Sequence, residues 1–501
     1  MIPPARQRIS DSEASETGYP VSDGTAKAAK PAALTPDICV IGAGGNGVAL
    51  AIAAAAFGVP VVLVERGAMG GDSGPLATRA LIEIGARAQA LRDAARFGLA
   101  AAEPQPNPAL IHAHVQRALA TDRANHTAER LATLGITVIR GEARFTSRST
   151  VIVDGRPIKA RRFVVATGAR VAPVAIAGLD AVPVLHEAEL AGLTRLPERP
   201  IVLGGSGAAL AQALRRLGCG ATLVAPEGLL AGHDQEAATI LRRRLLREGL
   251  ELHENGTPLR AERSRSGLRL VLATPSGETI VEGSHLLVCS PRLPEIDNLD
   301  LDLAGIRWDV SGIAVDRGLR TSNRRVHVLG ACAGGAATAR SDRAGDDHVG
   351  LLLRSILFRQ PVKIDPRSEP GISWSQPQVA SLGLPEAEAR AAAGTIRVLR
   401  WPFSENAAAQ AAGETEGFVK AVVDRKGHIL GVTIVGEHAG ELIAPWCMAM
   451  RAGLGLGDIA GLPLPAISRS DASRRAALSF HATLTTRPGL RRLIGFLRRF
   501  G

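Results

Sequence analysis

A buried strand, a glycine-rich turn and a helix follow one another early in the chain. The apolar stretch 37–41 runs into a Gly-x-Gly-x-x-Gly pattern, an alanine-rich helical stretch follows through Phe57, and a second apolar run ends in an acid. In such a turn the first glycine makes the tight bend, the second lets backbone approach a pyrophosphate, and the third lets helix pack on strand. The helix N-terminus offers N–H groups to phosphates, and the acid accepts hydrogen bonds from a ribose. The stretch therefore predicts a dinucleotide site formed by Gly42, Gly44, Gly47 and Glu65.

Composition indicates a large globular protein. The chain has 501 residues, of which 46% are hydrophobic and 21% are charged, so about three domains are expected. The uncharged stretch 47–64 is nearly long enough to span a bilayer, but Gly58-Val59-Pro60 divides it into a helix and a strand. No signal peptide is visible. The five cysteines are widely spaced and odd in number, which favours buried thiols in a reducing cytoplasm over disulfides or a metal site.

The same pattern recurs in the middle of the chain, after an N-terminal stretch, 1–36, that reads as a flexible extension. Residues 201–207 form an apolar strand and a turn containing Gly204, Gly205 and Gly207, followed by a helix and another apolar strand. Two such units imply two nucleotide-binding domains in an α/β fold. Further expected elements are helices over 76–96, 108–135 and 349–358, a buried strand ending in the turn Ala166-Thr167-Gly168, and a hairpin over 418–435.

The order of these motifs resembles the flavin-dependent pyridine nucleotide-disulfide oxidoreductases, near the branch of dihydrolipoamide dehydrogenase and mercuric reductase. The resemblance runs from about Leu34 to the C-terminus, and is clearest in the first turn, in 59–72, in 413–420 and in 436–443. It implies two Rossmann-like domains, for FAD and NAD(P), and a C-terminal α+β dimerisation domain. The implied division is an extension (1–36), an FAD domain (37–172 and 296–365), an NAD(P)-like domain (173–295), a dimerisation domain (366–480) and a basic amphipathic tail (481–501).

The resemblance also implies which residues hold the cofactors and that the protein is a homodimer. The FAD residues would be Gly42, Gly44, Gly47, Glu65, Arg66, Asp72, Ala166, Thr167, Gly168, Gly330 and Ala331, and the NAD(P) residues Gly204, Gly205 and Gly207.

The family's redox centre is missing from this sequence. Members carry a C-x4-C pair directly after Gly-Gly-Asp/Thr, and one thiolate attacks the disulfide substrate while the other contacts the flavin. Ser73 stands where the first cysteine belongs, and the segment is too short to hold the second. The lysine expected beside the flavin is replaced by Arg79. No catalytic residue can be assigned with these changes.

Three further sites depart from the family pattern. The second glycine turn is shortened and the acid expected after its strand is Ala225, with Glu227 two residues later as a candidate substitute. The Gly-Asp pair that holds the ribityl chain is Gly330-Ala331, so a carboxylate is lost unless Asp342, Asp346 or Asp347 replaces it. The C-terminal segment 462–469 lacks the acid–base histidine and its carboxylate partner.

Two functions remain open. One is an FAD-dependent oxidoreductase that passes electrons from NAD(P)H to a small acceptor such as a quinone or oxygen, without disulfide chemistry. The other is a non-catalytic dimeric relative that acts as a binding or regulatory protein. Nucleic acid is not expected as a partner despite the net charge of +11, because aromatic residues are few and no nucleic-acid fold signature is present.

The C-terminal tail combines apolar residues at helical spacing with flanking arginines. The favoured interpretation is a helix docked on the protein's own dimer, and the alternative is a peripheral membrane contact. The apolar residues concerned are Leu490, Leu493, Ile494, Leu497 and Phe500.

Overall fold

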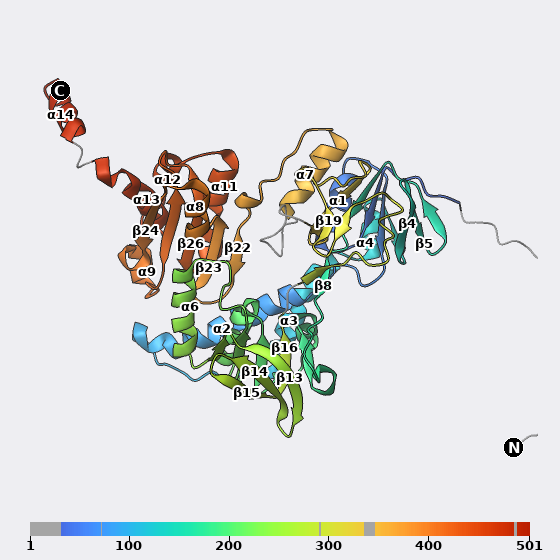
Figure 1. The fold of residues 1–501 in the computed structure, drawn as a ribbon, viewed down its shortest axis with the longest axis horizontal. Coiled ribbons are helices and arrows are strands. Elements are labelled where there is room, and N and C mark those ends of the chain that lie inside the picture. The colour runs from blue at the N-terminus through green and yellow to red at the C-terminus, as the bar shows by residue number, and fades with distance from the viewer. Residues whose placement is uncertain (1–31, 72, 290–291, 335–345, 485–487, 501) are drawn as a thin grey trace, which may run out of the picture.

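The chain folds into three lobes, each built on its own five-stranded sheet (Figure 1). The computed structural model describes residues 32–71, 73–289, 292–334, 346–484 and 488–500. The expectation of an α/β protein with two Rossmann-like units and a third α+β unit is confirmed by this arrangement.

The first lobe contains a parallel sheet whose strands come from two distant parts of the chain. Alternate side chains of its central strand face opposite sides: Ile38 and Val40 pack on α1 (Gly45–Ala55) and α7 (Asp346–Leu357), whereas Cys39 and Ile41 pack on an antiparallel β-layer. The sheet order is β20 (Val326–Val328), β7 (Arg162–Val165), β1 (Ile38–Ile41), β2 (Val61–Glu65) and β3 (Ile136–Arg140). The layer consists of β4 (Ala143–Ser147), β5 (Thr150–Val153) and β6 (Arg156–Ile158), and β18 (Trp308–Asp309), β19 (Gly312–Ala314) and β21 (Ala333–Gly334) form a smaller sheet nearby.

The second lobe repeats this design. Its parallel sheet has helices on one face and an antiparallel three-stranded layer on the other. The sheet order is β12 (Glu251–Glu254), β11 (Thr222–Ala225), β10 (Pro200–Leu203), β16 (His285–Val288) and β9 (Val184–His186). The helices are α5 (Ala208–Arg216) and α6 (Gln235–Arg247), and the layer is β13 (Thr257–Ser264), β14 (Gly267–Thr274) and β15 (Gly277–Gly283). The antiparallel pair β8 (Ala169–Val171) and β17 (Arg292–Pro294) joins the two lobes.

The third lobe is an antiparallel sheet covered by short helices around the buried Trp446. The predicted hairpin is present as β25 and β26. The sheet order is β22 (Gly371–Ser373), β23 (Gln378–Gly383), β26 (Ile429–Gly436), β25 (Phe418–Val423) and β24 (Arg397–Pro402). The helices are α8 (Glu386–Ala393), α9 (Ala407–Ala411), α10 (Ala439–Leu442), α11 (Ala444–Ala452), α12 (Leu456–Ala460) and α13 (Asp471–Leu478).

One long helix connects the lobes. Helix α2 (Gly74–Asp93) starts beside the first glycine turn and packs on α5 of the second lobe, where a side chain at Gly85 would come within 2.8 Å of Ala213 Cα. The expected single helix over 108–135 is instead two, α3 (Pro108–Ala124) and α4 (Ala128–Thr133), because Thr127 starts a new helix by accepting a hydrogen bond from Arg130 N–H at 3.2 Å.

The chain's last described helix, α14 (Pro488–Leu497), stands apart from the lobes in Figure 1. Its Leu493, Ile494, Phe496 and Leu497 are about half exposed, at 49 to 55%. Among the described residues, no helix combines the length and apolar character needed to cross a membrane.

Candidate functional site

The first glycine turn leaves no space for side chains at two of its positions. Gly42 has a φ of +108°, and a Cβ there would lie 2.4 Å from Ala166 O. A Cβ on Gly47 would lie 2.0 Å from Gly42 O. These contacts are far inside van der Waals distance, so both positions require glycine for the close packing of β1, α1 and the neighbouring turn.

Gly44 and Gly45 are different, because a Cβ at either position would meet nothing within 4 Å. This open space lies at the N-terminus of α1, where backbone N–H groups and the helix dipole favour an anion. Gly70 N–H donates to Ala43 O at 2.9 Å, so the loop before α2 runs alongside the turn. The result is a backbone cradle of the kind that admits a pyrophosphate.

Glu65 is fixed at the carboxyl end of β2, next to this cradle. Its carboxylate accepts hydrogen bonds from Ala43 N–H at 2.6 Å and Gly67 N–H at 2.7 Å. The following residue, Arg66, is half exposed and pairs with Glu295 at 3.1 Å. Glu65 therefore contacts the turn and is held by backbone, whereas Arg66 is held by a carboxylate outside the turn.

The small-residue turn after β7 lies against the first glycine turn. Ala166 N–H donates to Ile41 O at 2.8 Å, and Gly168, with φ +75°, has open space where a Cβ would stand. The Thr167 hydroxyl is enclosed and makes no hydrogen bond of normal geometry within the described residues. The polar group beside it is the Cys332 thiol, a weak partner. An enclosed polar atom without a good partner fits a position that a bound ligand completes.

The Gly330-Ala331 turn follows β20 and reaches the same edge of the sheet. A Cβ at Gly330 would lie 3.1 Å from the side-chain nitrogen of Asn46, the second residue of α1. Ala331 is exposed, and its methyl group offers no hydrogen bond where the resemblance places a carboxylate. Among the candidate replacements for the missing carboxylate, Asp342 lies outside the described residues, and Asp346 and Asp347 are the first two residues of α7. Asp72, which is also predicted to contact FAD, lies outside the described residues as well.

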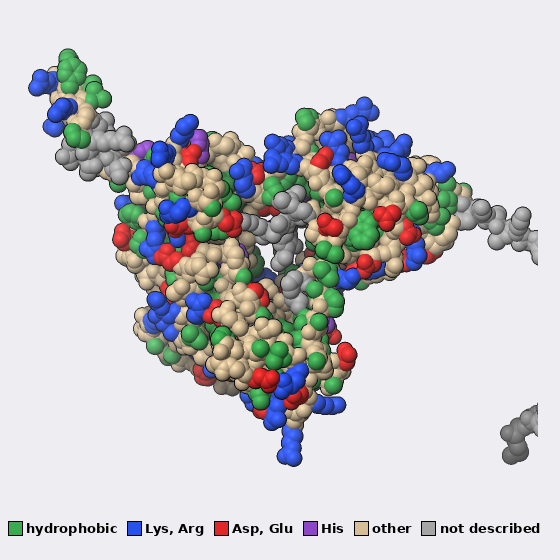
Figure 2. Space-filling view, in the orientation of Figure 1, with side chains coloured by type: hydrophobic (Ala, Val, Ile, Leu, Met, Phe, Trp, Pro, Cys, Tyr) green, Lys and Arg blue, Asp and Glu red, His purple; other side chains and the backbone are tan. Residues whose placement is uncertain are grey.

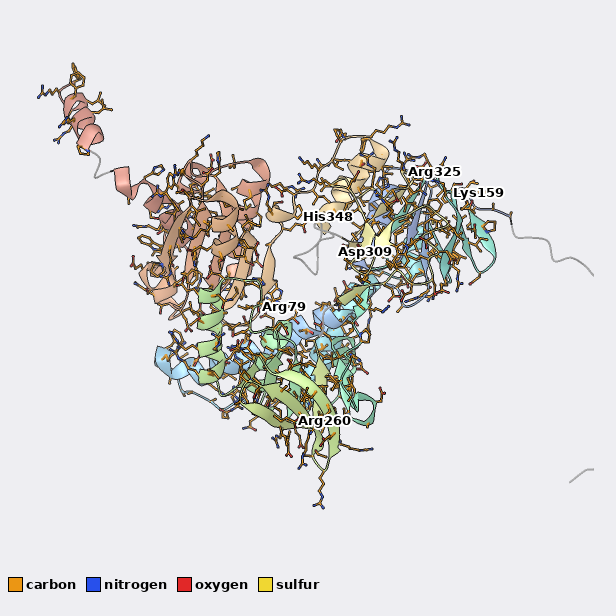
Figure 3. All side chains as sticks on the ribbon, in the orientation of Figure 1. Arg79, Lys159, Arg260, Asp309, Arg325 and His348 are labelled. Carbon is orange, nitrogen blue, oxygen red and sulfur yellow. The ribbon has the colours of Figure 1, made fainter. Side chains whose placement is uncertain are left out.

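The segment in which the resemblance places the redox centre is the start of α2. Ser73 is the residue before the helix, and its side chain makes no capping hydrogen bond. Thr78 Oγ1 donates to Glu187 Oε1 of the second lobe at 2.8 Å. Arg79 pairs with Glu83 at 2.8 Å, and its guanidinium lies 3.9 Å from the ring centroid of Trp374, from the third lobe (Figure 3). Arg79 therefore forms a cation–π contact between α2 and the third lobe.

The thiols of the chain are poorly suited to nucleophilic chemistry. None of the five cysteines forms a disulfide. Burial raises the pKa of Cys39 and of Cys289 to about 12, and that of Cys219 to about 11. Burial also raises the pKa of Cys332. With raised pKa values, these four thiols are protonated at neutral pH. They are unreactive in that form, because the thiolate is the attacking species.

The second glycine turn keeps the geometry of the first in spite of its changed sequence. Gly204 has φ +110°, and a Cβ there would lie 2.2 Å from Cys289 O. Gly205 N–H donates to Glu227 Oε1 at 2.8 Å across 22 residues, as Ala43 N–H donates to Glu65 Oε2 across 22 residues. Glu227 thus occupies the structural place of the acid that the sequence pattern lacks at Ala225.

Taken together, the residues of the first turn fit the adenosine and pyrophosphate part of a dinucleotide. The open cradle at Gly44 and Gly45, the helix N-terminus and the Thr167 hydroxyl supply suitable groups, while the turn at Ala331 lacks one. Within the described residues, no group of three or more His, Cys, Asp or Glu side chains is arranged to hold a metal ion.

Comparison with known proteins agrees with this geometry. Residues 36–345 match the family model of the pyridine nucleotide-disulphide oxidoreductases, and residues 369–473 match the family's dimerisation domain. A dihydrolipoyl dehydrogenase of Thermus scotoductus is 30% identical over 472 residues, covering 89% of this chain and 98% of the relative. A mercuric reductase of Lysinibacillus sphaericus is 28% identical over 457 residues, covering 89% and 82%.

Solved structures show the same fold. LpdA from Mycobacterium tuberculosis superposes with a TM-score of 0.79 at 24% identity, covering 89% of this chain and 99% of that one. The flavoprotein disulfide reductase RclA from Escherichia coli superposes with a TM-score of 0.76 at 22% identity. Members of the matched family are FAD-dependent and use NAD(P)H. The chain belongs to the pyridine nucleotide-disulphide oxidoreductase family.

Proposed function

We propose that the protein is an FAD-dependent oxidoreductase that takes electrons from NAD(P)H and passes them to a small acceptor, such as a quinone or oxygen, without a disulfide step. The observation that carries this proposal is the start of α2, where Ser73 stands in place of the first redox cysteine. A serine hydroxyl cannot cycle through a disulfide. Bound flavin itself carries hydride chemistry, so the protein would need only to bind and orient it.

In this proposal the cofactors are held mainly by backbone. The cradle at Gly44 and the N-terminus of α1 would bind the pyrophosphate of FAD, Glu65 would orient the adenosine ribose, and Thr167 would complete its hydrogen bonding against the cofactor. The turn at Gly204 and Gly205, with Glu227, would serve NAD(P)H. The division into FAD (37–172 and 296–365), NAD(P)-like (173–295), dimerisation (366–480) and tail (481–501) domains is part of this proposal.

The experiment that tests the function is spectroscopic. Purified protein is incubated with excess FAD, desalted, and titrated anaerobically with NADH or NADPH. We expect a yellow protein whose flavin absorbance is bleached by one of the two. The alternative is a non-catalytic dimeric binding or regulatory protein, favoured by the missing acid–base histidine in 462–469. Protein that stays colourless and gains no thermal stability from FAD would establish that alternative.

FAD is expected to bind more weakly than in relatives with a carboxylate at the position of Ala331. Losing one hydrogen bond from a charged group costs about 1.5 to 3 kcal/mol, or about ten- to a hundredfold in affinity. Ala331→Asp should therefore raise FAD occupancy after purification, and Ala331→Asn should raise it less. The side chain is exposed, so either variant should fold. Equal occupancy in all three proteins would contradict the assignment of this turn to the ribityl chain.

No turnover of lipoamide, glutathione disulfide or Hg²⁺ is expected. The four thiols whose pKa is raised are protonated at neutral pH, and Cys447 lies in the third lobe on α11. The measurement is NAD(P)H oxidation with each substrate, using FAD-loaded protein. Activity that disappears on changing Cys39 or Cys332 to serine would overturn the proposal.

The protein is expected to be a homodimer formed through residues 366–480. The matched dimerisation domain and the prevalence of two-fold symmetric assemblies support this. Light scattering at micromolar concentration should give about twice the chain mass of 52.2 kDa. A monomer under those conditions would count against the assignment.

For the tail, we propose docking of α14 on the dimer, with a peripheral membrane contact as the alternative.

A further inference from the structure

The edge of the first-lobe sheet opposite the nucleotide turn collects positive charge. In a parallel βαβ arrangement the strands begin, and the helices end, at the same edge. Here β7 begins at Arg162, β20 directly follows Arg325, and Arg359 lies just beyond the end of α7. Arg161 joins these elements, because its guanidinium donates to Ile356 O of α7 at 3.5 Å and pairs with Asp37 at 2.5 Å.

We call this surface the basic edge and define it by Arg161, Arg162, Arg325, Arg359 and the exposed side chains around them. Burial lowers the pKa of Arg162, and the nearby charges of Arg161, Arg325 and Arg359 lower it further, which shows that positive charge is crowded here. Figure 2 shows blue side chains gathered over the top of the lobe that carries α7, and Figure 3 places Arg325 and Lys159 there. The surrounding exposed cations are Lys159, Arg324, Arg354 and Lys363.

Two exposed aromatic side chains stand at the same edge. Phe57 follows the end of α1 and Phe358 follows the end of α7, and their rings pack edge to face with centroids 5.5 Å apart. They are 61% and 54% exposed, which is unusual for phenylalanine, a residue found mostly in cores. A surface with apolar rings among arginines is complementary to a partner that has anionic groups at its surface and an apolar layer beneath them.

We propose that the basic edge is a docking surface for an anionic phospholipid bilayer, on which the arginines contact headgroup phosphates and Phe57 and Phe358 enter the interfacial layer. Each cation near such a surface adds attraction, and aromatic rings favour the level of the headgroups. Single-stranded nucleic acid is the less suitable partner, because it binds by stacking bases on ring faces, whereas these two rings pack on each other. The surface lies away from the nucleotide cradle, so the inference does not depend on the proposed function.

The test measures cosedimentation of the full chain with vesicles of phosphatidylcholine containing about 30% phosphatidylglycerol. The anionic lipid gives these vesicles the negative surface charge that should attract the arginines. The variant R325E/R359E reverses two exposed charges of the basic edge. The control R263E/R265E makes the same charge change at exposed arginines near the turn between β13 and β14 of the second lobe. A deletion of residues 487–501 separates the contribution of the tail.

Wild type should bind the anionic vesicles, bind pure phosphatidylcholine much less, and lose binding as salt is raised. R325E/R359E should weaken binding by at least about tenfold, while R263E/R265E should change it by less than about threefold. Phe358→Trp should show a blue-shifted emission difference with anionic vesicles only. The proposal is overturned if no vesicle binding occurs, if binding depends on the tail and not on the basic edge, or if an oligonucleotide binds this surface and vesicles do not.

Discussion

Replacing Gly44 with leucine is expected to abolish FAD binding while changing the free energy of unfolding by no more than about 1 kcal/mol, the scale of a weakened helix cap. The backbone there, with φ −68° and ψ 172°, is accessible to any residue, and a Cβ would meet no atom within 4 Å. The leucine side chain would instead fill the cradle at the N-terminus of α1. Flavin absorbance after desalting measures occupancy, and urea denaturation measures stability.

Two matched variants make this result interpretable. Gly192→Leu introduces the same side chain at another open position and should leave FAD binding intact. Gly47→Ala places a Cβ 2.0 Å from Gly42 O and should destabilise the fold by more than about 3 kcal/mol, because backbone itself must move. If Gly44→Leu retains wild-type affinity for FAD, the first turn is not the cofactor site.

The second large effect is expected at the buried ion pair between α5 and the end of α6. Arg216 and Glu248 are 3% and 7% exposed, and are joined by hydrogen bonds of 2.7 and 2.8 Å. Arg216 also donates to the side chain of Gln376, which ties the second lobe to the third. Arg216→Met keeps the volume but leaves Glu248 with Arg244 as its remaining ion-pair partner, and should cost about 3 to 5 kcal/mol.

This cost should depend on pH in a definite direction. Burial alone would raise the pKa of Glu248, but hydrogen bonds and charges from Arg216 and Arg244 outweigh it, so the folded-state pKa lies below the ordinary glutamate value of 4.5. A lowered carboxyl pKa stabilises the protein above the unfolded-state pKa, and that stabilisation disappears as pH falls through the folded-state pKa. The difference between wild type and Arg216→Met should therefore shrink below about pH 4.5.

Chemical denaturation at neutral and acidic pH measures this difference. The control is Arg260→Met, whose pairs with Glu262 and Glu278 are exposed to solvent and therefore screened, so its loss of stability should be much smaller than that of Arg216→Met. Equal losses for the buried and the exposed arginine would contradict the argument from burial.

The sequence was sufficient to predict features that depend on local geometry. The two strand–glycine–helix units were predictable because Gly42 and Gly204 adopt positive φ values and lie against backbone, so no other residue fits. The sequence pattern does not reveal the break between α3 and α4, although Thr127 is a good N-cap, because alanines at 120, 124, 128 and 132 continue at helical spacing across it. An N-cap residue inside a stretch with helical spacing therefore indicates the start of a new helix, even where the spacing is not interrupted.

Contacts between lobes could not be predicted in the same way. The stacking of Arg79 on Trp374, and the packing of α2 against α5, join segments that are far apart in sequence. The spacing of residues within one segment cannot predict such contacts, because they depend on how the three lobes are arranged. The role of Glu227 was only partly predictable: its type and approximate position were visible, but its hydrogen bond to Gly205 N–H required the folded turn.

That hydrogen bond has a consequence for how such sites disappear during evolution. The Glu227 carboxylate accepts a hydrogen bond from a backbone N–H of its own turn, as Glu65 does in the first turn, so each acid stabilises the turn through a contact within the protein. Selection for a correctly folded turn would therefore retain glycines and an acid long after selection for ligand affinity had relaxed. The presence of the motif would then show that the turn descends from a nucleotide-binding turn, and only a binding measurement would show whether it still binds a nucleotide.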